Sequence, residues 1–131
     1  MPVQMPVPIL KQGSVLIASI QTALTDTDVL RLQNKLIEQV GRYRSRGIVV
    51  DVAAIDVMDS FVARSLRAIA QMTRLRGAEM VLVGIQPEVA FAMVQLGTSL
   101  EDVHTALDLE EGLALLESLG GEAGRHGGPG S

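Results

Sequence analysis

The chain has 131 residues, a formal net charge of −4 and 20% charged residues, which is typical of one globular domain. It contains no cysteine, so disulfides, thiolate catalysis and cysteine-based metal sites are excluded. One Tyr, two Phe and no Trp argue against a base-stacking nucleic-acid surface, and the acidic charge argues against phosphate-backbone binding. The N-terminus lacks the basic start and apolar run of a signal peptide, and no apolar stretch nears the roughly 20 residues of a membrane span. We therefore expect a soluble, cytoplasmic protein.

The first twenty residues are predicted to form an antiparallel pair of strands. Prolines keep residues 1–6 extended, because proline cannot donate to a sheet ladder. An edge strand at residues 9–10 and a longer strand at 14–20 flank the turn residue Gly13. So short a connection favours antiparallel pairing.

The next stretch is typical of an amphipathic helix followed by a buried strand. Thr25 is a suitable N-cap. Apolar residues then recur at helical spacing, in a stripe made of Val29, Leu32, Leu36, Val40 and Tyr43. Arg42, Arg44 and Arg46 crowd the helix end, and we favour a role at the helix C-terminus over an anion site. Residues 48–52 are nearly all apolar, which indicates a strand covered on both faces.

Strands and helices alternate through the second half of the chain. A helix is expected from Ser60 to about Arg76, followed by an apolar strand at residues 79–83 and a helix that begins near Pro87. A short strand at residues 103–106 comes next. The last helix is expected to start after the N-cap Asp108, to end at Leu119 before Gly120 and Gly121, and to leave residues 120–131 as a flexible tail.

This order of elements predicts an α/β fold with a single domain at residues 7–119. Helical crossovers between consecutive strands give parallel pairing, while the first two strands pair antiparallel. The expected sheet is mixed, mostly parallel and four- to five-stranded.

The turns that connect strands to helices carry no recognisable catalytic loop. The turn ending at Ser60 (VMDS) has no glycine and the turn ending at Pro87 (GIQP) has no lysine, so neither is a P-loop or a dinucleotide fingerprint. Ser60 lacks the glycines of a hydrolase nucleophile elbow, and neither His104 nor His126 is placed beside it. Two histidines do not make a metal cluster, so no metal or cofactor is expected. A small enzyme that uses Ser60 or an acid is therefore a weak alternative.

Asp59 and Ser60 are both favoured N-cap residues, and the helix needs only one of them. The hydroxyl of Ser60 is then available for a second role if Asp59 takes the cap. Asp56 and Asp59 could also be read as paired acids or as a magnesium site. Turn and cap roles are the commoner explanation for acids at such positions.

The helix after Ser60 has two stripes of apolar and small residues, whereas a helix that faces one core needs one. The sheet-facing stripe is Val62, Leu66, Ile69 and Thr73. The second stripe is Phe61, Ser65, Ala68 and Met72. It suggests a contact surface for another protein, although a wide buried face explains it equally well. The following helix likewise has Phe91 and Val94 outside its expected core stripe of Val89, Ala92, Met93 and Leu96.

Several motifs resemble the STAS domain of bacterial anti-sigma factor antagonists, over about residues 7–119. They are VMDS before a helix, DSFV at its start, and LVGIQPE at the next strand end. Common antagonists have DSSG or DSAG, whereas Asp59 and Ser60 are followed here by Phe61 and Val62, as in the stressosome branch. RsbR-type members have Thr at the serine position and an added sensory domain. With Ser60 at this position, the chain therefore resembles the single-domain RsbS type.

The resemblance implies that Ser60 is phosphorylated by an RsbT-like serine kinase and dephosphorylated by an RsbX-like phosphatase. It also implies co-assembly with an RsbR-like paralogue into a non-catalytic scaffold that sequesters the kinase and releases it on phosphorylation. The expected partner-binding residues are Asp56, Asp59, Phe61, Arg64, Ser65 and Ala68. A simple anti-anti-sigma factor that binds an anti-sigma kinase one to one is the alternative. Thr98 and Ser99 stay open as second acceptors.

Overall fold

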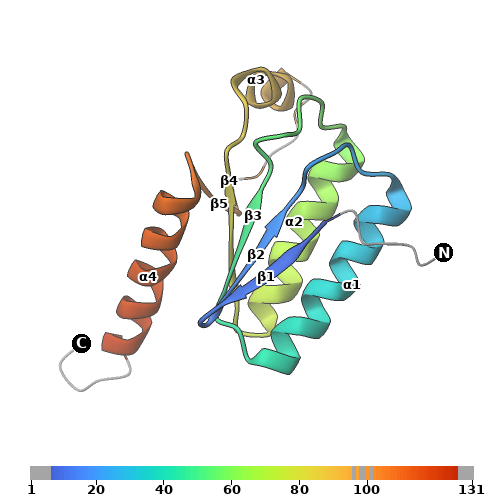
Figure 1. Ribbon diagram of the computed structural model, residues 1–131. Coiled ribbons are helices and arrows are strands. Elements are labelled where there is room, and N and C mark those ends of the chain that lie inside the picture. Colours follow the sequence, from blue (N-terminus) through green and yellow to red (C-terminus); the bar gives the residue numbers. More distant parts are fainter. Residues whose placement is uncertain (1–6, 96, 98–99, 101, 127–131) are drawn as a thin grey trace.

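A five-stranded sheet forms the centre of the protein, in a computed structural model that describes residues 7–95, 97, 100 and 102–126 (Figure 1). β1 (Ile9–Gln12) pairs antiparallel with β2 (Val15–Ser19). The parallel strands β3 (Gly47–Asp51), β4 (Glu79–Val83) and β5 (His104–Ala106) follow in chain order. The predicted mixed and mostly parallel sheet is confirmed, and the antiparallel edge strand is two residues longer than expected.

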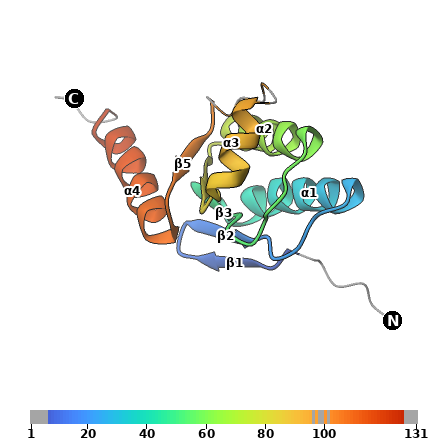
Figure 2. The same ribbon diagram turned by 90° about the horizontal axis from the view of Figure 1, so that it is seen from above.

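Helices cover the two faces of the sheet unequally. α1 (Asp26–Tyr43) and α2 (Ser60–Leu75) lie side by side on one face, and α4 (Leu109–His126) lies on the other (Figure 2). The shorter α3 (Pro87–Gln95) sits beyond the carboxyl ends of the strands (Figure 1). Parallel strands require such crossovers, because the chain must return to the same end of the sheet before the next strand can begin.

The start of α1 is fixed by the predicted N-cap. Thr25 Oγ1 accepts the backbone N–H of Asp28 at 3.1 Å, and Asp28 Oδ2 accepts the backbone N–H of Thr25 at 3.0 Å. This reciprocal pair is a capping box. The Thr25 backbone N–H, and after it the Thr25 side chain, hold the pKa of Asp28 below its usual 3.8. A hydrogen bond that is donated to the carboxylate favours its charged form.

The core is divided by the sheet into two clusters. The larger one lies under α1, α2 and α3. It includes every residue of the predicted α1 stripe except Tyr43. The smaller one lies under α4 and consists of Ile17, Val49, Val81, Val83 and Leu116. Gly112 allows α4 to approach this closely, since a Cβ there would lie 2.7 Å from Cγ1 of Val83.

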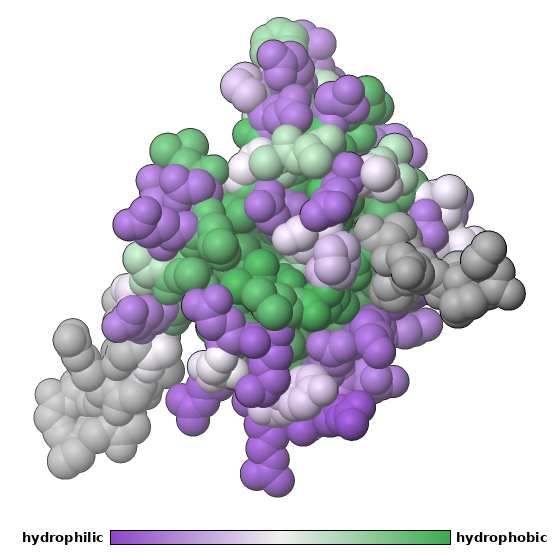
Figure 3. Space-filling model, in the orientation of Figure 1, coloured by the Kyte–Doolittle hydropathy of each residue, from purple (hydrophilic) through white to green (hydrophobic). Residues whose placement is uncertain are grey.

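The α4 face is incompletely covered. α4 contacts β3, β4 and β5, whereas Leu10 of β1 is 62% exposed. Apolar surface is visible between α4 and the strands in the middle of this face (Figure 3). This face is distinct from the one that carries α1 and α2.

Three details of the predicted helices are wrong. α4 continues to His126 through Gly120 and Gly121, because a helical glycine costs only about 1 kcal/mol relative to alanine and no proline intervenes. Tyr43 is 40% exposed, with the Lys11 ammonium and the Arg42 guanidinium near its ring instead of the core. Ala92 is exposed, although Val89 and Met93 are buried as expected.

Some predictions fall on residues outside the described ranges. They are the extended segment at residues 1–6, the core position Leu96, the possible acceptors Thr98 and Ser99, and the tail beyond residue 126. Within the described ranges, no helix is both long and apolar enough to cross a membrane.

Candidate functional site

Ser60 is the first residue of α2, and Asp59 is the N-cap. The Asp59 backbone is extended, and its Oδ1 accepts the Val62 backbone N–H at 2.8 Å. Of the two candidates for the N-cap of α2, Asp59 and Ser60, Asp59 is therefore the one that caps the helix. Ser60 is exposed, and no hydrogen bond of its hydroxyl is found within the described part of the chain. The hydroxyl is thus accessible from solvent and is not used to cap the helix.

The turn between β3 and α2 is anchored at several points before it reaches Ser60. The Val52 N–H donates to the Val83 carbonyl at 3.0 Å, and the Ile55 N–H donates to the Val52 carbonyl at 3.0 Å. Ile55 and Met58 are both 5% exposed and belong to the larger core cluster. Two buried side chains and a backbone tie to β4 hold the path of the turn.

A second loop, between β4 and α3, packs directly against this turn. Gln86 Nε2 donates to the Ala53 carbonyl at 2.6 Å. Gly84 has φ +80, and a Cβ on it would lie 2.9 Å from the Ala53 Cβ. A side chain at residue 84 would be strained by both its backbone conformation and this close approach. Gly84 and Gln86 therefore position the turn from outside.

The acidic residues of the turn lie on its surface. Asp56 and Asp59 are both exposed, and neither forms an ion pair within the ranges that the structure covers. Among the described residues, no group of three or more potential ligands could hold a metal ion. Asp56 lies four residues before Ser60 in the turn, and Asp59 directly precedes it and provides the helix cap.

The second stripe of α2 is only partly available to a partner. Phe61, Ser65, Ala68 and Met72 are all half-buried, and Phe61 and Met72 pack against the larger core cluster. The four residues of the sheet-facing stripe are fully buried, as predicted. The second stripe is therefore neither a fully buried face nor a fully exposed contact surface, since its residues are partly buried and partly exposed.

The predicted partner-binding residues are brought together unequally. Asp59, Phe61 and Arg64 lie within about one turn of Ser60, and Arg64 Nε donates to the Ser60 carbonyl at 3.3 Å. Ala68 lies eight residues further along α2, or about 12 Å at 1.5 Å per residue. The start of α2 thus carries a compact group of these residues, and Ser65 and Ala68 extend it along the helix.

Sequence reasoning missed three residues of this surface. Gly84 and Gln86 support the turn, and Val57 within the turn is 76% exposed. That the loops after β3 and β4 lie side by side could have been inferred, because the carboxyl ends of neighbouring parallel strands lie at the same end of a sheet. Phe91 and Val94, which lie outside the α3 core stripe as predicted, are 66% and 79% exposed.

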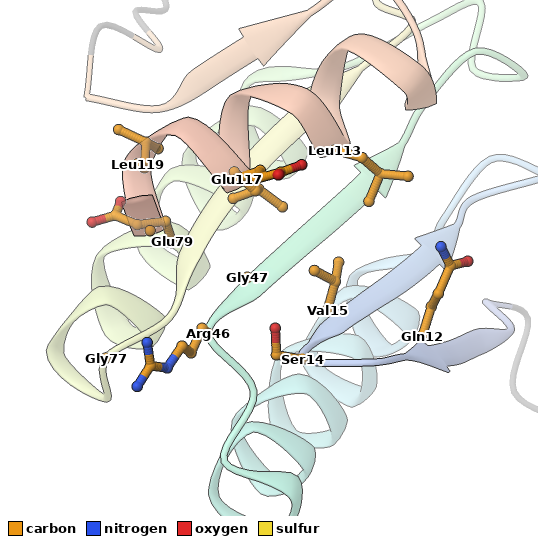
Figure 4. Close-up of a pocket in the computed structure, with 12 residues that line it drawn as sticks. Gln12, Ser14, Val15, Arg46, Gly47, Gly77, Glu79, Leu113, Glu117 and Leu119 are labelled. Atoms are coloured by element: carbon orange, nitrogen blue, oxygen red, sulfur yellow. The ribbon is translucent and has the colours of Figure 1, made fainter. Parts of the chain in front are cut away.

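A pocket of about 910 Å³ lies at the other end of the sheet, between α4 and the strands (Figure 4). Val15, Gly47, Leu113 and Leu116 contribute apolar walls to it. No predicted site residue lines it.

His104 lies away from Ser60. Its Nε2 is 3.2 Å from Oε1 of Glu79, at the start of β4. His104 is therefore not a base for the Ser60 hydroxyl.

Comparisons with known proteins identify relatives of the whole domain. Residues 7–112 match the STAS domain family. A serine-to-glutamate variant of RsbS from Moorella thermoacetica has 35% sequence identity and a TM-score of 0.76, covering 87% of this chain and 97% of that one. A chain in a solved structure of the stressosome, described as a signal integration and transduction hub, has 35% identity and a TM-score of 0.74, covering 86% and 98%.

A curated relative is larger than the matched region. The RsbT co-antagonist protein RsbRA of Bacillus subtilis (strain 168) is 34% identical over 83 residues, which is 63% of this chain and 30% of that protein. The chain thus spans about a third of the length of such relatives. The predicted resemblance to the stressosome branch is confirmed.

Proposed function

Because the chain belongs to the STAS domain family and is related to RsbS and RsbR proteins, we propose that it is a non-catalytic scaffold and phosphorylation-switched regulator of a cytoplasmic stressosome-type complex. Ser60 is the switch. The chain binds an RsbT-like serine kinase while Ser60 is unmodified and releases it after phosphorylation. An RsbR-like paralogue completes the scaffold, and an RsbX-like phosphatase resets Ser60.

The observation that carries the proposal is the division of roles between Asp59 and Ser60. Asp59 accepts the Val62 N–H at the start of the helix, so the exposed Ser60 hydroxyl can react without loss of this cap. The anchored turn holds that hydroxyl in a fixed place. A kinase substrate requires an accessible hydroxyl of this kind, and the reaction needs no catalytic group from the substrate.

The chemical step is a phosphoryl transfer from ATP held by the kinase. Ser60 Oγ forms a bond to the γ-phosphorus as the bond from that phosphorus to the ADP oxygen breaks. The hydroxyl proton passes to a base of the kinase, and ADP leaves. The products are ADP and a phosphoserine that carries about −1.5 to −2 charges at neutral pH.

The new charge would change the surface more than the fold. A helix N-terminus accommodates an anion, whereas the neighbouring Asp56 and Asp59 carboxylates oppose one. A kinase docked over Ser60 then loses affinity through repulsion and through the desolvation of the phosphate. The exposed Val57, Phe91 and Val94 are at the same end of the protein and supply apolar contact area for that kinase.

Calorimetric titration of the kinase tests the proposal. Unmodified protein is expected to bind the kinase, and both the phosphorylated protein and Ser60→Asp to bind at least tenfold more weakly. Phe91→Ser is expected to weaken binding, while Leu75→Ser is a matched control, since Leu75 is 88% exposed at the other end of α2. Equal affinity of the kinase for the modified and unmodified protein would contradict the proposal.

A further inference from the structure

Arg64 lies one helical turn after Ser60, and its side chain folds back toward it. Its Nε donates to the Ser60 carbonyl at 3.3 Å. Residues four apart share a face of a helix, and helical side chains lean toward the N-terminus. The guanidinium of Arg64 is therefore already held over the first turn of α2, beside the residue that the proposed function modifies.

The other arginines within α2 are engaged elsewhere. Arg67 pairs with Asp102 at 2.9 Å. Arg74 contacts Glu79 Oε1 at 3.4 Å and donates to the Asp102 carbonyl at 2.8 Å. Arg64 is exposed and forms no ion pair with any residue that the structure describes. It is thus the α2 cation that can move to a new anion.

We propose that Arg64 captures the phosphate on Ser60 and is thereby withdrawn from the partner surface, an inference that rests on the proposed phosphorylation of Ser60. The guanidinium exchanges its carbonyl contact for the phosphate oxygens, which are stronger acceptors because they are charged. The planar fork of arginine suits a phosphate, to which it can donate two parallel hydrogen bonds.

This exchange makes phosphorylation a double change. The surface around Ser60 gains an anion and at the same time loses a free cation. A partner that contacts Arg64 in the unmodified state therefore loses that cation and meets a more negative surface. The captured guanidinium also offsets the repulsion between the phosphate and the carboxylates of Asp56 and Asp59, so that α2 keeps its start.

The pair can be tested without any kinase, by incorporating phosphoserine at residue 60 during translation. The pKa of the second phosphate ionisation is then measured by phosphorus NMR in the otherwise unaltered protein, in Arg64→Gln and in Arg67→Gln. A nearby cation stabilises the dianion, so this pKa should be about 0.2–0.4 units lower with Arg64 present than in Arg64→Gln. Arg67→Gln, whose arginine is held by Asp102, should match the unaltered protein.

Equal pKa values with and without Arg64, or an equal rise in Arg67→Gln, would overturn the capture. Withdrawal from the partner surface is read separately from kinase binding. Unphosphorylated Arg64→Gln should bind the kinase several-fold more weakly than Arg67→Gln, and equal affinities would overturn this part. Since the NMR titration uses no kinase, its failure leaves the proposed switch intact. Failure of the kinase to phosphorylate Ser60 leaves the measured pair intact.

Discussion

At the scale of single residues, the site depends on the different roles of the adjacent side chains of Asp59 and Ser60. Asp59 accepts the Val62 N–H and closes the start of α2, which leaves the Ser60 hydroxyl exposed. If Ser60 were the cap, its hydroxyl would be committed to the helix, and modification would remove the capping bond. The observed arrangement allows modification without that loss.

Replacing Asp59 tests this division of roles. Asp59→Ala removes the acceptor of the Val62 N–H, and loss of such a cap typically costs about 0.5–2 kcal/mol of the free energy of unfolding. Asp59→Asn retains a side-chain acceptor and should cost clearly less. Urea denaturation measures both. Unchanged stability in Asp59→Ala would mean that Asp59 is not the effective cap.

The sequence predicted that one of these two residues would cap the helix, but not which one. Both side chains are strong N-cap formers, so residue preference cannot choose between them. The choice depends on where the buried Ile55 and Met58 place the end of the turn. That is a tertiary effect, and only the folded chain reveals it.

At the scale of elements, the turn before α2 is supported by the loop before α3. The two loops follow adjacent parallel strands, and Gly84 and Gln86 contact Ala53 directly. The strand and helix order was predictable because apolar runs and turn residues alternate clearly. That order also implies that the two loops lie side by side, but the specific contacts with Ala53 depend on the tertiary positions of the two loops and were not predicted.

Gly84→Ala tests whether this loop contact matters. The added Cβ meets Ala53 at 2.9 Å, so overpacking of about 1–3 kcal/mol adds to the backbone strain of about 1–2 kcal/mol at positive φ. Gly13→Ala is the matched control, because Gly13 has φ +61 and open space around its Cβ position. Thermal unfolding should therefore show a larger loss for Gly84→Ala. Equal losses would show that the close approach adds nothing.

The end of α4 shows where local signals were insufficient. Two successive glycines predicted a stop after Leu119, yet the helix continues to His126. Glycine weakens a helix without blocking its hydrogen bonds, unlike proline. A glycine pair therefore indicates a possible end and does not enforce one.

At the scale of the whole molecule, the turn before Ser60 and the pocket beside α4 lie at opposite ends of the sheet. Ser60 follows the carboxyl end of β3, whereas the pocket includes Gly47 at the start of the same strand. The sheet thus separates a surface that a kinase would cover from another that the proposed switch does not use.

Mapping the phosphate tests the central claim most directly. The protein is incubated with an RsbT-like kinase and ATP, and the modified residue is located by peptide mass spectrometry. We predict one phosphoryl group per chain, located on Ser60, and no modification of Ser60→Ala under the same conditions. Phosphate on another residue of the unaltered protein, or no phosphate at all, would contradict the assignment of Ser60 as the switch.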